Sequence, residues 1–274
     1  MVKASDNPSV LVDAISAAKR VLEEIPAGGT SLDAARRSEA LYELGVASSG
    51  LGRHEEAAGY LKDAEMTMSD LPGSQAVVTM TRLHLEGELH ELRRYEDVVA
   101  VTEQALEAGS EMGTELSTGF QYFRCEALVR LHRWAEANAA GHALVRTIGD
   151  RGSTLGVGEV AKGYWAQGKA LRELGDLDLA LPVLDQATDA ARALPLEHDP
   201  SFRVLLCAVL IERALVLEAM RRRAEARDAY AAVISQFAGE SDRRVRRLVR
   251  MVRRRRLALR LGCSPQPPSN PGSR

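Results

Sequence analysis

The chain has 274 residues, of which 45% are hydrophobic, 27% are charged and only 4% are aromatic. It is long enough to bury a substantial core, and this balance is that of a soluble globular protein. Ala, Leu, Arg and Glu dominate. These strong helix formers, with the shortage of aromatic and β-branched residues, exclude a large sheet and predict an all-α fold.

The cysteines and the hydropathy pattern indicate the compartment. Cys125, Cys207 and Cys263 lie far apart and are odd in number, which argues against a disulfide framework and fits a reducing environment. The N-terminal stretch lacks the apolar segment of a secretory signal, and no apolar run approaches the roughly 20 residues that span a bilayer. We therefore expect a cytoplasmic protein without a transmembrane segment.

The formal net charge of −2 hides a strong asymmetry along the chain. After Asp242 there are eleven arginines and no acidic residue, whereas residues 1–242 carry 25 basic against 38 acidic residues. The sequence therefore predicts an acidic body followed by a basic C-terminal segment.

A first helix is predicted within residues 1–30. Pro8 fits a first helical turn with Asp6 or Asn7 as its cap, and apolar residues then recur at helical spacing as far as Ile25. Pro26 and the glycines after it end the helix. Because it resembles the second half of a hairpin whose first half is missing, we interpret it as an N-terminal capping helix.

Residues 31–238 repeat one layout, in which a helix ends at an apolar hinge residue, a short turn follows and a second helix begins. The hinge residues are Leu51, Leu92, Leu131, Leu174 and Met220, at intervals of 41, 39, 43 and 46 residues. These intervals are irregular but typical of helical-repeat arrays. The sequence therefore predicts about five stacked helical hairpins.

Small residues recur at fixed distances from the hinge residues. Six residues before them lie Gly45, Glu86, Cys125, Gly168 and Ala214, and six residues after them lie Ala57, Val98, Ala137, Ala180 and Ala226. Two helices approach closely only where side chains are small, so these positions predict the contact points within each hairpin. Glu86 stands where a small residue is expected.

With these residues the chain resembles the tetratricopeptide repeat family, in a long variant of about 40 residues per repeat. The segments LGVASSGLGRHEEAAGYLKDA (44–64) and QGKALRELGDLDLALPVLDQA (167–187) match its pattern well, and the third and fifth units are degenerate. The resemblance implies an α–α superhelix, or α-solenoid, with capping helices at both ends.

The resemblance also implies a concave groove, lined by the first helix of each hairpin, that binds a peptide or helix of another protein. The groove positions carried over to this chain include Tyr42, His90, Tyr122, Glu126, Arg130, Lys162, Trp165, Lys169 and Arg172. Trp165 beside Lys169 and Arg172 suits a carboxylate or acidic residue of a partner. The alternative is that Trp165 packs against the neighbouring repeat.

A basic helix is predicted within residues 239–262, where arginines surround a thin apolar stripe. The arginines expected to contact an anionic partner are Arg246, Arg250, Arg253 and Arg254. Three interpretations stay open: a solvated cap of the array, a contact with nucleic acid, and a helix lying on an acidic membrane or partner. Residues 263–274 are expected to be disordered.

No pattern of residues predicts catalysis, a cofactor or a metal site. His90 and Glu91 begin like a zinc-hydrolase helix, but Arg94 stands where the second histidine is required. The glycine-rich stretch 149–158 lacks the lysine–serine or lysine–threonine pair and the preceding strand of a phosphate loop.

The sequence thus favours a non-enzymatic interaction scaffold whose partner is another protein. The alternative is a regulatory module, similar to the repeat domains of bacterial transcription regulators, in which the arginine-rich helix contacts nucleic acid. A third hypothesis is self-association into a homo-oligomer through an apolar end of the array.

Overall fold

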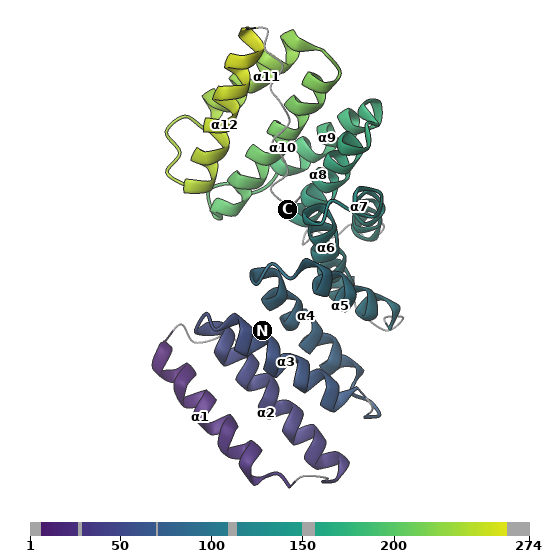
Figure 1. Ribbon diagram of the computed structural model, residues 1–274, viewed down its shortest axis with the longest axis vertical. Helices are drawn as coiled ribbons and strands as arrows, with labels where there is room; N and C mark the ends of the chain where they lie inside the picture. The colour runs from purple at the N-terminus through teal and green to yellow at the C-terminus, as the bar shows by residue number, and fades with distance from the viewer. Residues whose placement is uncertain (1–6, 27–28, 70, 109–113, 150–156, 262–274) are drawn as a thin grey trace, which may run out of the picture. The chain divides into compact units, whose positions relative to one another are not determined.

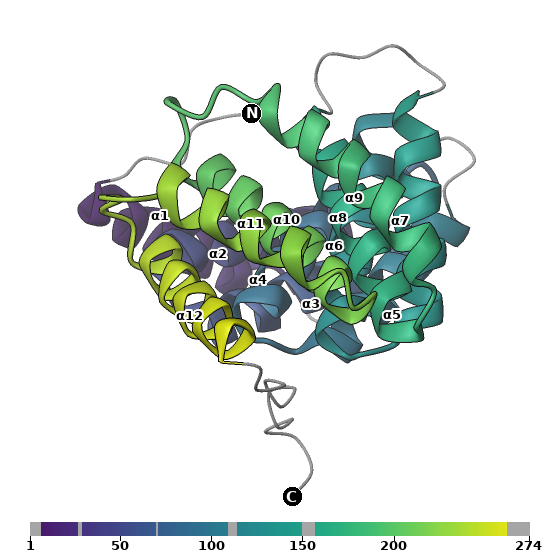
Figure 2. The ribbon, with the colours of Figure 1, turned by 90° about the horizontal axis from the view of Figure 1, so that it is seen from above.

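The computed structural model describes residues 7–26, 29–69, 71–108, 114–149 and 157–261, drawn as a ribbon in Figures 1 and 2. These residues form twelve α-helices and no strand, which confirms the all-α prediction. The chain divides into two compact units, residues 1–132 and 133–274, each of which is described by itself. The tail expected to be disordered and residues 150–156 of the glycine-rich stretch lie outside the described residues.

The first unit contains six helices, each packed against the next along the chain. They are α1 (Pro8–Glu24), α2 (Ser31–Gly50), α3 (His54–Met68), α4 (Gln75–Glu91), α5 (Tyr95–Glu107) and α6 (Thr114–Arg130). As predicted, α1 is a single helix packed on the first hairpin, and the Asn7 side chain caps it by accepting from the Ser9 N–H.

The second unit also contains six helices packed in sequence. They are α7 (Trp134–Gly149), α8 (Val157–Leu174), α9 (Leu177–Arg192), α10 (Pro200–Ala219), α11 (Arg223–Gln236) and α12 (Arg243–Arg260). Besides its neighbour in sequence, α10 contacts α8 and α12. The first helices of successive hairpins therefore lie side by side, and α12 takes the position of one more first helix.

The predicted hinge residues lie at the ends of the first helices, and the residue after each hinge has a positive φ. These are Gly52 (70°), Arg93 (59°), His132 (59°), Gly175 (90°) and Arg221 (60°). In the hairpins at Leu51, Leu92, Leu174 and Met220, the N–H two residues after the hinge bonds the carbonyl three residues before it, at 2.9–3.0 Å. This bond closes a left-handed turn that satisfies the helix end.

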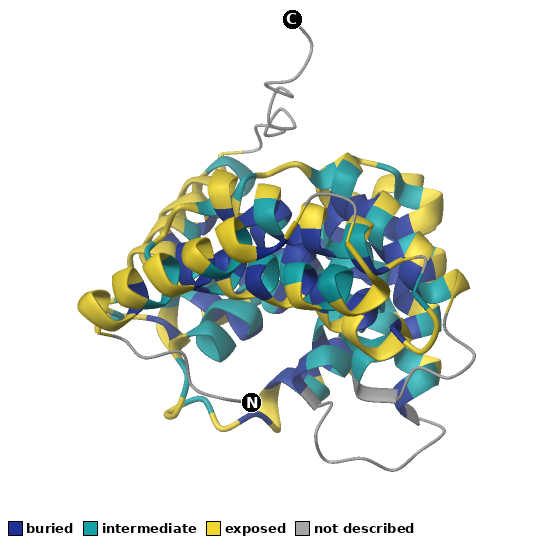
Figure 3. Cartoon of the chain, turned by 90° about the horizontal axis from the view of Figure 1, so that it is seen from below, coloured by how far each residue is buried: buried dark blue, intermediate teal, exposed yellow. Residues whose placement is uncertain are grey.

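The small residues late in the first helices make close helix contacts possible, as predicted. A Cβ on Gly45 would lie 2.6 Å from Leu61 Cγ, and one on Gly168 would lie 2.5 Å from Leu184 Cγ. Both distances are far below van der Waals contact, so only glycine fits there. Buried and exposed positions recur along second helices such as α3 and α9, whereas the first helices α6, α8 and α10 are mostly buried or intermediate (Figure 3).

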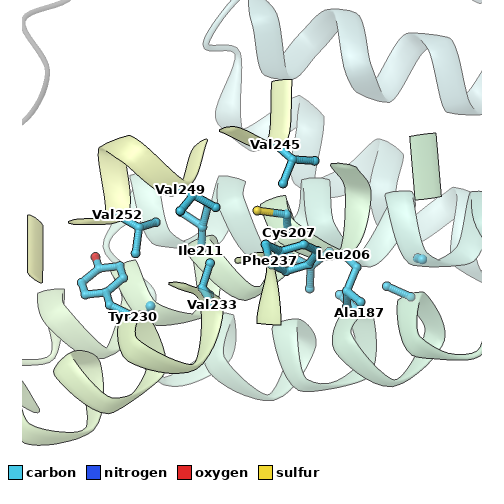
Figure 4. Packing of buried hydrophobic residues seen from close by; sticks show 14 of the residues in the cluster. Ala187, Leu206, Cys207, Ile211, Tyr230, Val233, Phe237, Val245, Val249 and Val252 are labelled. Atoms are coloured by element: carbon cyan, nitrogen blue, oxygen red, sulfur yellow. The ribbon is translucent and has the colours of Figure 1, made fainter. Parts of the chain in front are cut away.

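The largest core cluster of the second unit runs from α8 through α9, α10 and α11 to α12. Figure 4 shows Val245, Val249 and Val252 of α12 facing the side chains of α10 and α11, among them Ile211 and Tyr230. The three valines are between 0% and 5% exposed. The basic helix is therefore a C-terminal capping helix, as the resemblance implies. No described helix is both long enough and apolar enough to cross a bilayer.

Candidate protein-binding surface

An apolar hollow opens on the first-helix side of the first unit. It has a volume of about 310 Å³ and is lined by Tyr42 of α2 and by Ala76, Val77 and Met80 of α4. Val77 is 45% exposed and Met80 is 36% exposed. Exposed apolar side chains gathered around a hollow are typical of a surface that a partner covers.

Polar side chains join α2 to α4 beyond this hollow. The Tyr42 and His84 rings meet edge to face with centroids 5.4 Å apart. Ser49 donates to Glu88 at 2.6 Å, and His54 Nδ1 lies 2.8 Å from the other oxygen of the same carboxylate. Burial lowers the pKa of His84, which favours its neutral form.

The structure brings four of the predicted groove residues together where α4 meets α6. Tyr122 donates to Glu126 at 2.6 Å, and Arg130 donates to the other carboxylate oxygen at 3.2 Å. His90 Nε2 lies 3.5 Å from Glu126, an ion-pair distance when His90 is protonated. Burial alone would raise the pKa of Glu126, but His90, Tyr122 and Arg130 lower it to about 2, so the carboxylate stays charged.

In the second unit, Trp165 is half-buried and packs against the main core cluster. Lys169, one turn further along α8, places its ammonium 5.4 Å from the centre of the Trp165 ring. Lys162 is half-buried one turn before Trp165. Packing against the neighbouring repeat, the alternative considered for Trp165, is thus what the structure shows for part of its surface.

Arg172 is engaged within the protein. It donates from Nε to Glu212 of α10 at 2.9 Å and from a terminal nitrogen to Glu173 at 2.8 Å. Only 19% of its side chain is exposed. Its guanidinium is held between two first helices, so an incoming carboxylate would compete with Glu212 and Glu173.

A glutamate bridges each pair of neighbouring first helices within a unit. Glu88 joins α2 to α4, Glu126 lies between α4 and α6, and Glu212 joins α8 to α10. Glu218 of α10 accepts from Arg255 of α12 at 3.3 Å and from Tyr230 of α11 at 2.6 Å. These carboxylates join neighbouring first helices, whereas the hollow at Val77 and Met80 leaves apolar side chains exposed.

The sequence analysis missed Ala76, Val77 and Met80, because the groove residue that it predicted in the second hairpin was His90, near the other end of α4. A signal was nevertheless present. Val77 and Met80 are three residues apart and continue toward His84 at helical spacing, so they share a face of α4.

The described residues offer little reactive chemistry. Among them, no three or more His, Cys, Asp or Glu side chains gather as metal ligands. Cys125 and Cys207 are buried, and burial raises the pKa of each thiol to about 12, so neither is a ready nucleophile.

Paired helices packed in sequence, with small residues at the crossings and a shared left-handed turn, define an α-solenoid of helical hairpins. Within it, residues 161–194 match the family model of the tetratricopeptide repeat. The predicted resemblance is therefore confirmed, by sequence for the α8–α9 hairpin and by fold for the remainder. A comparison with curated proteins finds no match.

Three solved structures illustrate the shared fold. BtubC (BKLC) from P. vanneervenii is 16% identical, with 96% of this chain and 94% of that chain covered and a TM-score of 0.57. The apo form of RapI is 13% identical, with 90% and 92% covered and a TM-score of 0.57. NprR in complex with its cognate peptide NprX is 15% identical, with 93% and 68% covered and a TM-score of 0.50.

Proposed function

We propose that the protein is a non-enzymatic interaction scaffold that binds a peptide or helix of another protein on the first-helix face of residues 1–132. The observation that carries this proposal is the apolar hollow between α2 and α4, with Val77 and Met80 exposed at its edge. An apolar side chain of the partner fills the hollow. Full burial of a leucine or similar side chain contributes about 1.5–3 kcal/mol.

The surroundings of the hollow suit a peptide ligand. Glu88 and Glu126 lie further along the first-helix face, toward the C-terminal ends of α4 and α6, and side chains of their own unit already hold them, so this part of the face is polar and fixed. Preorganised surfaces reduce the entropy cost of binding. NprR, which shares this fold, was crystallised in complex with its cognate peptide NprX, and this supports a peptide as the class of ligand.

We propose Trp165 and Lys169 as a second contact for the partner, on the first-helix face of residues 133–274. The exposed part of the Trp165 ring and the ammonium beside it would receive an apolar or acidic side chain. Arg172 serves mainly to hold α10 in place through Glu212.

The test begins with a photo-crosslinking amino acid at position 77, which captures the partner in cells so that mass spectrometry identifies it. Binding of the purified partner is then measured with Met80→Glu. We expect the affinity to fall by about tenfold or more, because a charge would have to be buried in the hollow.

Met66→Glu is the matched control. Met66 is 65% exposed on α3, a second helix of the same unit, so it introduces the same charge outside the hollow. The control should bind within about twofold of the unchanged protein. An equal loss of affinity in both variants, or no loss of affinity with Met80→Glu, would refute the proposed surface.

A further inference from the structure

The basic helix α12 presents two faces of opposite character. Its inner face carries Val245, Val249 and Val252, which are buried against α10 and α11. Asp242 caps the helix by accepting from the N–H groups of Arg244 and Val245. The helix is therefore held in one orientation, and its outer face is fixed toward solvent.

The outer face is a stripe of arginines. Eight arginines of α12 are exposed. Arg244 pairs with Asp242, and the other seven form the stripe: Arg243, Arg246, Arg247, Arg250, Arg253, Arg254 and Arg260. They recur at intervals of three, four and seven residues, so they share one side of the helix. No acidic residue occurs between Arg243 and Arg260.

Some arginines elsewhere in the protein have local acidic partners. Arg94 pairs with Asp97, Arg133 with Glu136 and Arg222 with Glu225, each three residues further along the chain. The arginines of the stripe form no ion pair with a described residue. Like charges three or four residues apart on a helix destabilise it by roughly 0.2–0.5 kcal/mol per pair, so the stripe carries a cost that an anionic ligand would remove.

The chemistry of the stripe fits phosphates. The helix contains arginine and no lysine, and the guanidinium fork matches phosphate oxygens in a bidentate manner. The stripe extends for about 25 Å at 1.5 Å per residue, which is long enough to meet several phosphates of a nucleic-acid backbone.

A membrane surface fits the structure less well. A basic amphipathic helix binds a bilayer by inserting its apolar face among the lipids. In α12 that face is already buried in the protein, and the exposed apolar residues are few: Met251 near the middle, and Leu257 and Leu261 toward the C-terminal end.

We propose that the outer face of α12 binds the sugar–phosphate backbone of nucleic acid, while its inner face closes the core of residues 133–274. The stripe offers no aromatic, Asn or Gln side chain to a base. We therefore expect phosphate contacts to dominate, with arginine–guanine contacts as the remaining way to read a base. This inference is separate from the proposed peptide contacts at the hollow on α2 and α4 and at Trp165 of α8, and neither proposal depends on the other.

The test is fluorescence anisotropy of the full chain with a labelled DNA duplex and a labelled RNA duplex of about 20 base pairs over a series of salt concentrations. With seven phosphate contacts, the logarithm of the binding constant should fall with the logarithm of salt at a slope near −6. Combined substitution of Arg246, Arg250, Arg253 and Arg254 by Gln should reduce this slope by about 3–4.

The charge-matched control replaces Arg53, Arg94, Arg213 and Arg222 by Gln, which removes the same charge from arginines that are paired within the protein. It should keep the slope of the unchanged protein. Thermal unfolding of both variants checks that the fold persists. If the control reduced the slope as much as the stripe variant does, net charge alone would explain the effect, and the proposal would be overturned.

Two further results would also overturn it. One is binding to phosphatidylserine vesicles without binding to either duplex. The other is a dimer, seen by light scattering, that the stripe variant disrupts while neither duplex binds, because the stripe would then contact the acidic body of a second copy.

Discussion

Arg172 of α8 donates to Glu212 of α10 at 2.9 Å across 40 residues of sequence. The two side chains are 19% and 11% exposed, and they join the first helices of successive hairpins. Such a pair sets the spacing of two helices that share no turn, and it has a measurable coupling energy.

A double-mutant cycle with Arg172→Ala and Glu212→Ala should give a coupling of about 1–3 kcal/mol, because each single change leaves a partly buried charge without its partner. Urea unfolding followed by circular dichroism measures it. The same cycle on the exposed pair Arg213 and Asp185 should give under about 1 kcal/mol. Equal couplings for the two pairs would contradict a special role for Arg172.

Gly45→Ala should destabilise the protein by about 1–3 kcal/mol, because the added Cβ would lie 2.6 Å from Leu61 Cγ. Gly59 on the adjoining helix α3 has nothing within 4 Å of its added Cβ, so Gly59→Ala should stabilise by about 0.5–1 kcal/mol. The sign of the change thus differs between two helical glycines of one hairpin. Chemical unfolding of both variants measures the two changes in stability.

Arg93→Gly should stabilise the protein by about 0.5–1 kcal/mol, because Arg93 holds a φ of 59° that glycine adopts without strain. Arg93→Ala removes the same side chain but keeps the strain, so it should bring no gain. The reverse change at the equivalent turn, Gly175→Ala, should cost about 1 kcal/mol. A gain with Arg93→Ala would show that the side chain rather than the backbone is the source of the effect.

Glu86 should make stability depend on pH. Its carboxyl group is buried without a hydrogen-bond partner among the described residues, and burial raises its pKa from 4.5 to about 10. Below pH 4.5 the group is protonated in both states. Above it the unfolded chain loses the proton while the folded chain keeps it. The free energy of unfolding therefore falls by up to about 1.4 kcal/mol per pH unit until the pH nears 10.

Glu86→Gln is the reference for this measurement, since it keeps the size and removes the titration. The free energy of unfolding of the variant should rise relative to that of the unchanged protein as the pH is raised from about 6 to about 9. Parallel pH profiles would mean that Glu86 is ionised in the folded state.

The repeat architecture was predictable from sequence because its determinants are local. A hinge residue, a turn and a small residue six positions earlier recur within single hairpins, and the structure confirms Gly45 and Gly168 as contact points. The capping helices were predictable for the same reason, since each has its own apolar stripe.

The surface chemistry was harder to predict because it depends on which residues face each other across two hairpins. Arg172 was expected to meet a partner's carboxylate, yet Glu212 reaches it from α10. The hollow at Tyr42 needs Val77 and Met80 from the next hairpin. Repeats of unequal length shift these pairings, so no fixed sequence interval reveals them.

The position of α12 has a consequence for solubility. It covers the apolar sides of α10 and α11 at Ile211, Tyr230 and Val233. A protease cut in the turn at residues 237–242, followed by loss of α12, would expose this apolar surface at the end of the repeat array. Two copies cut in this way would pair end to end through the same apolar surface, and such a two-fold contact closes at a dimer. The helix that carries the outward arginines thus also keeps this apolar surface covered.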